Sequence, residues 1–383
     1  MNIVIVTSYY PNSDGSSYGT KAIHNFTKEW VKQGHKVVVL FNTYQATRLL
    51  KPFVKKNYIK KYEEYSIEGV SVIHNVFTRY IPKSNFIFPS IIRAKAKQVV
   101  ELLEDRQWKP DKICVHYCTE NWQFSRNFAC LMNLDAVPIF HKCDINREKQ
   151  AKRILGQVSI AGARSRPIEE KIRKMAADTV STFFVPSGSP NLGISCVHKG
   201  IEKKKGSFLY AGDLIQLKNV DILIEAFSAV RTQSDDKCSL TIVGDGVMRS
   251  ELENLVESKN MKKHIRFTGK LPHDKVLTLM EETETFVMVS SPETFGLVYM
   301  EALASGCLVI GSKGEGIDGI IENGVNGFLV EPRNTDELTK ALTSIVDMDF
   351  STKKLLIERG YQTSKKYSEE NVALEYARKI AET

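Results

Sequence analysis

The chain has 383 residues, of which 42% are hydrophobic and 26% are charged. These proportions are those of a globular protein and exclude a disordered or fibrous chain. The length favours two domains of similar size, because a single core rarely grows so large. The sequence contains no run of about 18 apolar residues, so we expect no membrane-spanning helix.

The two halves of the chain carry opposite charge. Lys and Arg outnumber Asp and Glu by 14 in residues 1–200 and are outnumbered by 6 in residues 201–383. A basic first half indicates an anionic partner, and phosphorylated lipid, membrane surface and nucleic acid all fit this observation. The seven cysteines are scattered and no secretion signal precedes the first strand, so we expect free thiols and a cytoplasmic location.

In chain order, short apolar runs alternate with amphipathic segments. The first half begins with a strand, and its first helix, over Tyr18–Gln33, ends at Gly34. A second clear helix spans Asn219–Arg231, with an apolar stripe along one face. The predicted strands are Ile3–Thr7, Lys36–Phe41, Val70–Asn75, Lys112–His116, Val137–His141, Thr179–Val185, Ser207–Gly212, Ser239–Gly244, Ile265–Gly269, Thr285–Val289, Leu308–Gly311 and Gly327–Val330.

This alternation predicts an α/β protein with parallel sheets covered by helices on both faces. A break near Pro186–Gly206 divides it into two doubly wound domains that face each other, over residues 1–186 and 187–366. Ligands of such sheets bind at the carboxyl ends of the strands, so we expect the site in the cleft between the domains.

The strongest candidate site follows the predicted strand Thr285–Val289. Ser290-Ser291-Pro292 ends the strand, Glu293 occupies the turn and a helix begins near Phe295, with Glu301 two turns further on. The free amides at such a helix start bind phosphate, and carboxylates accept hydrogen bonds from sugar and ribose hydroxyls. In the alternative interpretation Glu293 is only a helix N-terminal charge and Glu301 a solvated residue.

The segment Glu293–Glu301 resembles the Glu-x7-Glu motif of retaining glycosyltransferases of family 4, which have the GT-B fold of two facing Rossmann-like domains. The resemblance covers nearly the whole chain and is weakest from Thr43 to Trp108. Further similar segments, in family order, are Gly15 and Gly19, Gly34–Val37, Tyr210–Gly212 with Lys218, Ile242–Gly246, Phe267–Gly269 and Gly324–Val330.

The resemblance implies roles for individual residues. Glu293 would contact the donor sugar as a catalytic residue, Glu301 would bind the ribose, and Lys218 would bind the diphosphate. His141 would be the second catalytic residue, although a lone histidine is often structural. The other donor-binding residues would be Gly212, Phe295, Gly296, Leu297, Val298, Gly269, Lys270 and Leu271, with an acceptor or phosphate loop at Gly15, Ser16, Ser17 and Gly19.

One position departs from the family pattern, because Asp213 stands where the family usually has an arginine. Arg164, Arg166 or Lys142 are candidates to supply the missing positive charge. The resemblance also implies that a helix in residues 367–383 returns to the first domain. Because the sequence offers no credible carboxylate cluster at a strand end, we expect no required metal and no cofactor besides the nucleotide-sugar co-substrate.

Three further patterns resemble binding motifs but lack the surroundings that such motifs need. Gly314–Gly319 matches the dinucleotide fingerprint G-x-G-x-x-G, but no long helix can follow it because Asn-Gly pairs interrupt within a few residues. Asp347-Met348-Asp349 resembles a metal-binding D-x-D but lies between late helices, so we interpret it as an exposed loop. Cys114 and Cys118 lack zinc-site spacing.

The segment Lys51–Tyr62 combines five lysines with aromatic and aliphatic residues, and Asn85–Arg93 adds an apolar patch beside further basic residues. This composition suits a helix on an anionic membrane surface and equally an ordinary basic face over a core. We find no module that reads nucleic acid.

The residues together with this resemblance therefore predict a retaining, metal-independent glycosyltransferase. Its donor would be a nucleoside-diphosphate sugar, UDP-linked for preference, and its acceptor a lipid-linked saccharide of cell-envelope, capsule or exopolysaccharide synthesis. It would act at the inner face of the plasma membrane. The alternatives are a phosphorylase or epimerase of the same fold, and a non-enzymatic protein that binds anionic lipid.

Overall fold

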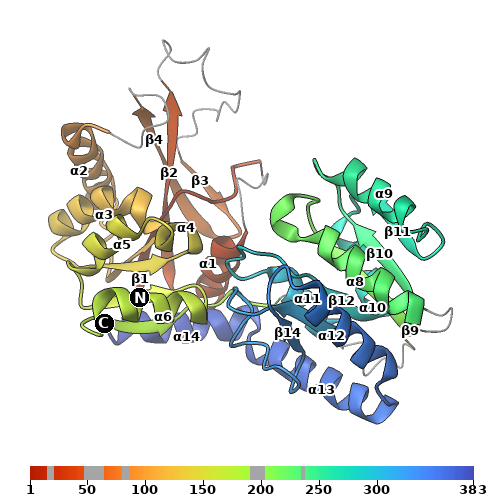
Figure 1. The fold of residues 1–383 in the computed structure, drawn as a ribbon. Coiled ribbons are helices and arrows are strands. Elements are labelled where there is room, and N and C mark those ends of the chain that lie inside the picture. The colour runs from red at the N-terminus through yellow and green to blue at the C-terminus, as the bar shows by residue number, and fades with distance from the viewer. Residues whose placement is uncertain (15–20, 47–63, 80–86, 190–202, 234–237) are drawn as a thin grey trace. The chain divides into compact units, whose positions relative to one another are not determined.

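The computed structural model describes residues 1–14, 21–46, 64–79, 87–189, 203–233 and 238–383 (Figure 1). The chain forms two compact units. The first comprises residues 1–164, 168–186 and 369–383, and the second comprises residues 165–167 and 187–368. None of the helices in the described ranges is both long enough and apolar enough to cross a membrane.

The first unit contains an eight-stranded sheet in the order β3-β4-β2-β1-β5-β6-β7-β8. All neighbouring strands are parallel except β3 and β4. Its strands are β1 (Asn2–Thr7), β2 (Lys36–Ala46), β3 (Glu64–Ile67), β4 (Val70–Arg79), β5 (Lys112–His116), β6 (Ala136–Phe140), β7 (Ile160–Ala163) and β8 (Ser181–Phe184). Its helices are α1 (Ala22–Lys32), α2 (Pro89–Asp105), α3 (Cys118–Met132), α4 (Lys142–Ile145), α5 (Glu148–Leu155), α6 (Arg166–Ala176) and α14 (Glu369–Ala381).

Two cores cover the two faces of this sheet. Successive side chains of a strand point to opposite faces, so Ile3 and Ile5 of β1 join the core beneath α1 and α14, while Val4 and Val6 join the core beneath α2, α3, α5 and α6 (Figure 1). Because both faces are buried, β1 is apolar at every position from Ile3 to Val6. The last helix is fixed to α1 by a hydrogen bond of 2.7 Å from Trp30 Nε1 to Ala373 O.

The second unit contains a six-stranded sheet in the order β11-β10-β9-β12-β13-β14, with every neighbouring pair parallel. Its strands are β9 (Lys204–Ala211), β10 (Ser239–Val243), β11 (Ile265–Gly269), β12 (Thr283–Val287), β13 (Leu308–Ser312) and β14 (Phe328–Val330). Its helices are α8 (Val220–Gln233), α9 (Arg249–Ser258), α10 (His273–Glu282), α11 (Leu297–Ala304), α12 (Thr335–Asp347) and α13 (Phe350–Lys366), with a 3₁₀ turn at Gln216–Lys218.

The strand order of the second sheet reverses between β9 and β12, because the chain runs outward from β9 to β11 and then outward on the other side from β12 to β14. A crevice at such a switch point is where doubly wound sheets bind ligands. The prediction of two Rossmann-like, doubly wound domains is confirmed.

Three local predictions need correction. The chain forms β7 and β3 where no strand was predicted, and β3 is antiparallel to β4. The helix expected near Phe295 begins at Leu297, so Glu301 lies one turn into it and not two. The reason is Gly296, whose φ of +77° is incompatible with a helix.

Candidate active site

The segment that follows β12 is fixed by hydrogen bonds to its neighbours in the second unit. Asn219 Nδ2 donates to Val289 O at 2.7 Å, and Ser291 N donates to Leu217 O at 2.9 Å. These two bonds join the carboxyl end of β12 to the 3₁₀ turn that follows β9. The two strands at the switch point thus hold their connecting loops against each other.

Glu293 lies in this segment and its carboxylate is engaged on both oxygens. Oε2 lies 2.7 Å from Lys218 Nζ and accepts from Ser290 Oγ at 3.2 Å, and Oε1 accepts from Thr294 N at 3.1 Å. The side chains of Glu293 and Lys218 are only 15% and 22% exposed. Lys218 is therefore not a solvated charge at a helix start, because it closes the 3₁₀ turn and pairs with Glu293.

The N-terminus of α11 follows directly after this turn. Gly296 adopts the left-handed conformation, and a Cβ at this position would lie 2.5 Å from the Tyr299 ring, so only glycine fits. Tyr299 OH donates to Met288 O at 2.5 Å, which ties the helix to the end of β12. The amides of Leu297 and Val298 stand in the first turn, where an α-helix offers donors to an anion. Phe295, by contrast, is buried.

Glu301 forms a second pair with a residue that sequence reasoning missed. Its Oε1 lies 2.9 Å from Nε2 of His273, the first residue of α10. The Glu301 side chain is 15% exposed and His273 is 64% exposed. His273 lies two residues beyond the predicted donor-binding residues Gly269, Lys270 and Leu271, and that proximity is the only signal for it in the sequence.

The loops after β9, β10 and β11 lie side by side. Gly212 N donates to Val243 O at 3.0 Å, and Gly244 N donates to Gly269 O at 2.9 Å. Asp213, at the position of the missing arginine, lies 3.5 Å from Lys270, and both side chains are well exposed. The structure thus brings together Gly212, Lys218, Lys270, Glu293, the start of α11 and Glu301 within one unit.

The other candidates for a compensating cation have different surroundings. Arg164 is buried in the first unit, where its Nη1 donates to Pro186 O at 3.2 Å and burial lowers the pKa of the guanidinium to about 10. Arg166 begins α6, whose first two residues fall in the second unit, and its side chain lies against Gly319. Lys142 begins α4 in the first unit.

His141 belongs to the first unit and lies between β6 and α4. Its Nε2 lies 3.0 Å from His116 Nδ1, and its ring stacks on Tyr117 at 3.9 Å between centroids. Burial, assisted by His116 and Arg164, holds the pKa of His141 well below its usual range. His141 is therefore neutral at physiological pH, which suits a hydrogen bond to a hydroxyl better than a charge interaction.

Three further predictions do not fall on the residues described so far. The loop of Gly15, Ser16, Ser17 and Gly19 and the segment Lys51–Tyr62 lie outside the described residues. Asp349 of the D-x-D sequence caps α13 by accepting from Thr352 N at 3.0 Å. Within the described ranges, no group of three or more His, Cys, Asp and Glu side chains is arranged to hold a metal ion.

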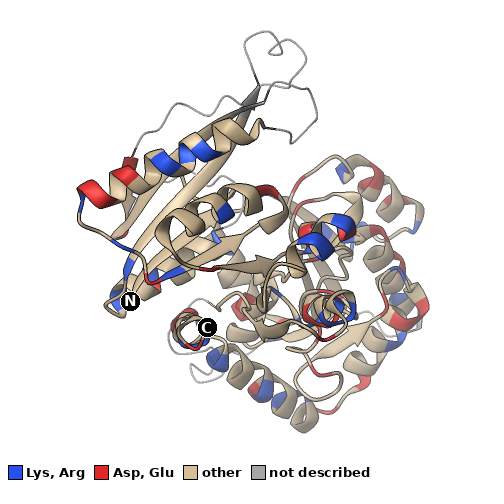
Figure 2. Ribbon diagram, turned by 90° about the vertical axis from the view of Figure 1, so that its left-hand side faces the viewer, with Lys and Arg blue, Asp and Glu red and all other residues tan. Residues whose placement is uncertain are grey.

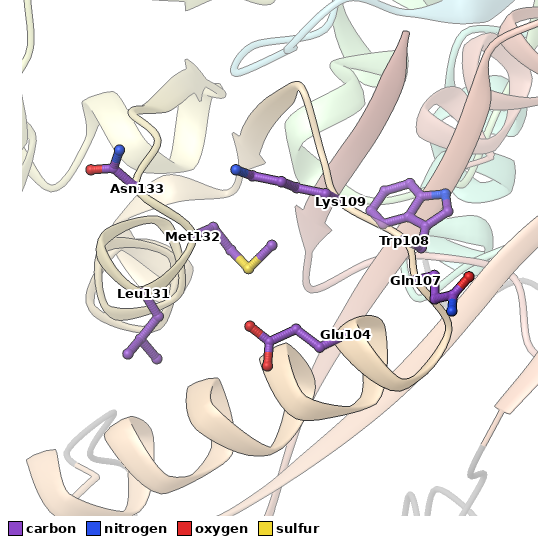
Figure 3. A pocket seen from close by; sticks show the side chains of 7 residues that line it. All are labelled: Glu104, Gln107, Trp108, Lys109, Leu131, Met132 and Asn133. Carbon is purple, nitrogen blue, oxygen red and sulfur yellow. The ribbon is translucent and has the colours of Figure 1, made fainter.

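A pocket of about 410 Å³ in the first unit is separate from these residues (Figure 3). Glu104 and Met132 point toward its middle, and it lies where α2 and α3 end, beside the amino end of β5. Ligands of parallel sheets bind at the opposite, carboxyl edge, so we exclude this pocket from the candidate site. The remaining lining residues are Gln107, Trp108, Lys109, Leu131 and Asn133.

The site thus combines two carboxylates, each paired with a basic side chain, with a helix N-terminus at the switch point of a doubly wound sheet. Such a combination is typical of a nucleotide-binding domain. Residues 181–363, nearly half of the chain, match the family described as glycosyl transferases group 1. Most of this match lies in the second unit.

Individual relatives are also named as glycosyltransferases. Over 181 residues the chain is 31% identical to an uncharacterised glycosyltransferase of Methanocaldococcus jannaschii, a match that covers 46% of this chain and 49% of the relative. The chain thus spans about half the length of that relative.

Solved structures extend the likeness to the whole chain. A sucrose-phosphate synthase from Thermosynechococcus elongatus superimposes with a TM-score of 0.74 at 17% identity, covering 100% of this chain and 98% of that one. HepE of Anabaena, solved in complex with UDP-glucose, superimposes with a TM-score of 0.66 at 16% identity, with both chains fully covered. At these identities the likeness establishes the fold, which is GT-B.

Proposed function

We propose that the chain is a retaining glycosyltransferase that moves a sugar from a nucleoside-diphosphate donor, most simply a UDP-sugar, to a saccharide acceptor. The observation that carries the proposal is the Lys218–Glu293 pair, set at the switch point between the start of α11 and the loop after β9. It combines a cation for the diphosphate with a carboxylate for the sugar. HepE was solved with UDP-glucose, which supports a UDP-linked donor.

Each part of the donor would meet a different group of the second unit. Glu301 would accept hydrogen bonds from the ribose hydroxyls, and the loop of Gly269, Lys270 and Leu271 would contact the base. The amides of Leu297 and Val298 would bind the diphosphate together with Lys218, whose ammonium would turn from Glu293 toward the phosphate. Glu293 would then be free to accept from the sugar hydroxyls.

In the transfer step, the bond between the anomeric carbon and the diphosphate oxygen breaks as the acceptor oxygen bonds to the same face of that carbon. The departing phosphate oxygen takes the acceptor's proton, so no protein base is required. Lys218 and the helix amides stabilise the negative charge that develops on the diphosphate. His141, neutral and in the first unit, would donate a hydrogen bond to the sugar. No metal takes part in this scheme.

We further propose that the acceptor is lipid-linked and that the protein works at the inner face of the plasma membrane, in envelope, capsule or exopolysaccharide synthesis. Support comes from the net positive charge of residues 1–200 and from the basic, aromatic segment Lys51–Tyr62. Helix α2 adds an exposed Phe88 followed by Arg93, Lys95 and Lys97 along its first half, with acidic residues toward its end (Figure 2).

Saturation-transfer NMR with UDP-, GDP- and ADP-sugars, followed by a transfer assay with the best binder, tests the proposal. We expect one nucleotide series to bind, its diphosphate more tightly than its monophosphate, and an α-configured donor to give an α-linked product. An inverted product would contradict retention, and a requirement for free phosphate would indicate a phosphorylase. Tight binding to anionic vesicles without any nucleotide-sugar binding would indicate a non-enzymatic lipid-binding protein.

A further inference from the structure

The glycine-rich segment Gly314–Gly319 has no role in the proposed chemistry, yet it packs on the turn that carries Glu293. It follows β13, the neighbour of β12 in the sheet. Glu315 Oε2 accepts from Glu293 N at 2.7 Å, and Gly316 N donates to Glu293 O at 3.1 Å. Both backbone groups of Glu293 are therefore held by consecutive residues of this segment.

Glu315 holds the turn at a second point. Its Oε1 accepts from Ser291 Oγ at 2.9 Å, so one carboxylate spans the turn from Ser291 to Glu293. Glu315 is only 8% exposed. Hydrogen bonds to an ionised acceptor are roughly twice as strong as neutral ones, and burial protects them from competition by water.

Gly316 makes the close approach possible. A Cβ at this position would lie 2.3 Å from both Phe295 N and Thr294 C, which are backbone atoms that cannot move aside locally. Gly316 therefore allows the main chain of the Gly314–Gly319 segment to pack directly against the main chain of the turn. This packing also explains the match to the dinucleotide fingerprint. The position of Gly316 needs a glycine because the turn lies against it, and no pyrophosphate is needed to account for it.

We propose that Glu315 is a positioning residue, which sets the orientation of Glu293 without touching substrate. This inference rests on the proposed function of Glu293. A positioning role affects turnover and nucleotide affinity differently. Turnover depends on where the Glu293 carboxylate points, whereas nucleotide affinity depends on Glu301, Lys218 and the start of α11. Loss of Glu315 should therefore lower kcat and leave the affinity for UDP within about twofold.

The experiment is a double-mutant cycle on transfer activity, combined with UDP titration by calorimetry. We expect Glu315→Ala to lower kcat by about 10- to 100-fold, the scale for misplacing a reacting group by about 1 Å. Glu315→Gln should recover most of the activity, because its amide can accept from Glu293 N and donate to Ser291 Oγ. In a Glu293→Ala background, Glu315→Ala should have no further effect.

Asp318→Ala is the matched control, because Asp318 lies in the same segment but bonds Gly314 N and not the turn; its kcat should equal that of the wild type. Wild-type turnover in Glu315→Ala, an equal loss of kcat and UDP affinity, or additive effects in the cycle would each overturn the inference. Full activity of Glu293→Ala would instead overturn the proposed function itself.

Discussion

Lys218 Nζ and Glu293 Oε2 lie 2.7 Å apart, although 75 residues separate them in the chain. One residue follows β9 and the other follows β12, the two strands between which the sheet reverses its order. The pair is largely screened from solvent, so it is stronger than a surface ion pair but can still be exchanged for a more highly charged anion such as a diphosphate.

This arrangement predicts that Lys218 sets the preference for diphosphates. Lys218→Ala should weaken UDP binding by about 1.5–3 kcal/mol, the scale for a hydrogen bond to a charged group, and change UMP binding much less. Calorimetric titration with both nucleotides measures the difference. Lys262→Ala, which removes an exposed lysine paired with Glu257, serves as the control. An unchanged preference for UDP in Lys218→Ala would rule out this role.

Glu301 should govern binding of the nucleoside. Glu301→Ala removes the carboxylate that now pairs with His273, and we expect a loss of about 1–3 kcal/mol in nucleotide affinity. The loss should be equal for UDP and UMP, since the ribose is common to both. A deoxyribose analogue should bind wild type and variant alike if its missing hydroxyl is the one that Glu301 binds. Unequal losses of affinity for UDP and UMP would show that Glu301 does not bind the ribose.

The proposed chemistry needs no divalent metal. Transfer activity should survive extensive dialysis against EDTA and should not rise when Mg²⁺ or Mn²⁺ is restored, because Lys218 and the amides of α11 supply the positive potential. The assay is a comparison of initial rates at saturating donor. A rate that collapses with EDTA and returns with Mn²⁺ would show that an ion completes the diphosphate site.

Acid should destabilise the first unit through His116 and His141. Burial holds the pKa of both imidazoles well below the ordinary value of 6.5, so the folded state keeps them neutral while the unfolded chain takes up protons. Their contribution to the free energy of unfolding is complete above about pH 6.5. It is lost as the pH falls, by up to about 1.4 kcal/mol per pH unit for each imidazole. Urea unfolding at pH 7.5 and 5.5 should show a smaller drop in His116→Gln than in wild type; identical drops would contradict this account.

Residues 51–62 should mediate docking on anionic membranes. Each lysine near an anionic surface contributes about 1 kcal/mol, so replacing Lys55, Lys56, Lys60 and Lys61 with Ser should abolish co-sedimentation with anionic liposomes. Transfer to a short water-soluble acceptor should continue, since the donor residues lie in the second unit. If the quadruple variant sediments as the wild type does, docking does not depend on this segment.

Sequence reasoning found most strands because buried parallel strands are continuous apolar runs. It missed β7, whose residues Ile160–Ala163 are mostly small and carry little apolar signal. It found Glu293 and Glu301 because the motif that contains them is defined by spacing along the chain, and that spacing does not depend on tertiary structure. Glu315 could not be found in that way, because its contact with Glu293 exists only after β13 pairs with β12. The sequence of Gly314–Gly319 excludes a following long helix, but it gives no indication that this segment packs against Glu293.

Hydrogen exchange of the full chain, with and without saturating UDP, tests the proposed donor site most sharply. We expect slower amide exchange with UDP in the peptides that contain residues 216–218, 269–273 and 293–301, which are far apart in sequence but belong to the candidate site of the second unit. Binding of UDP without protection of residues 293–301 would rule out this donor site, and so would protection confined to the first unit.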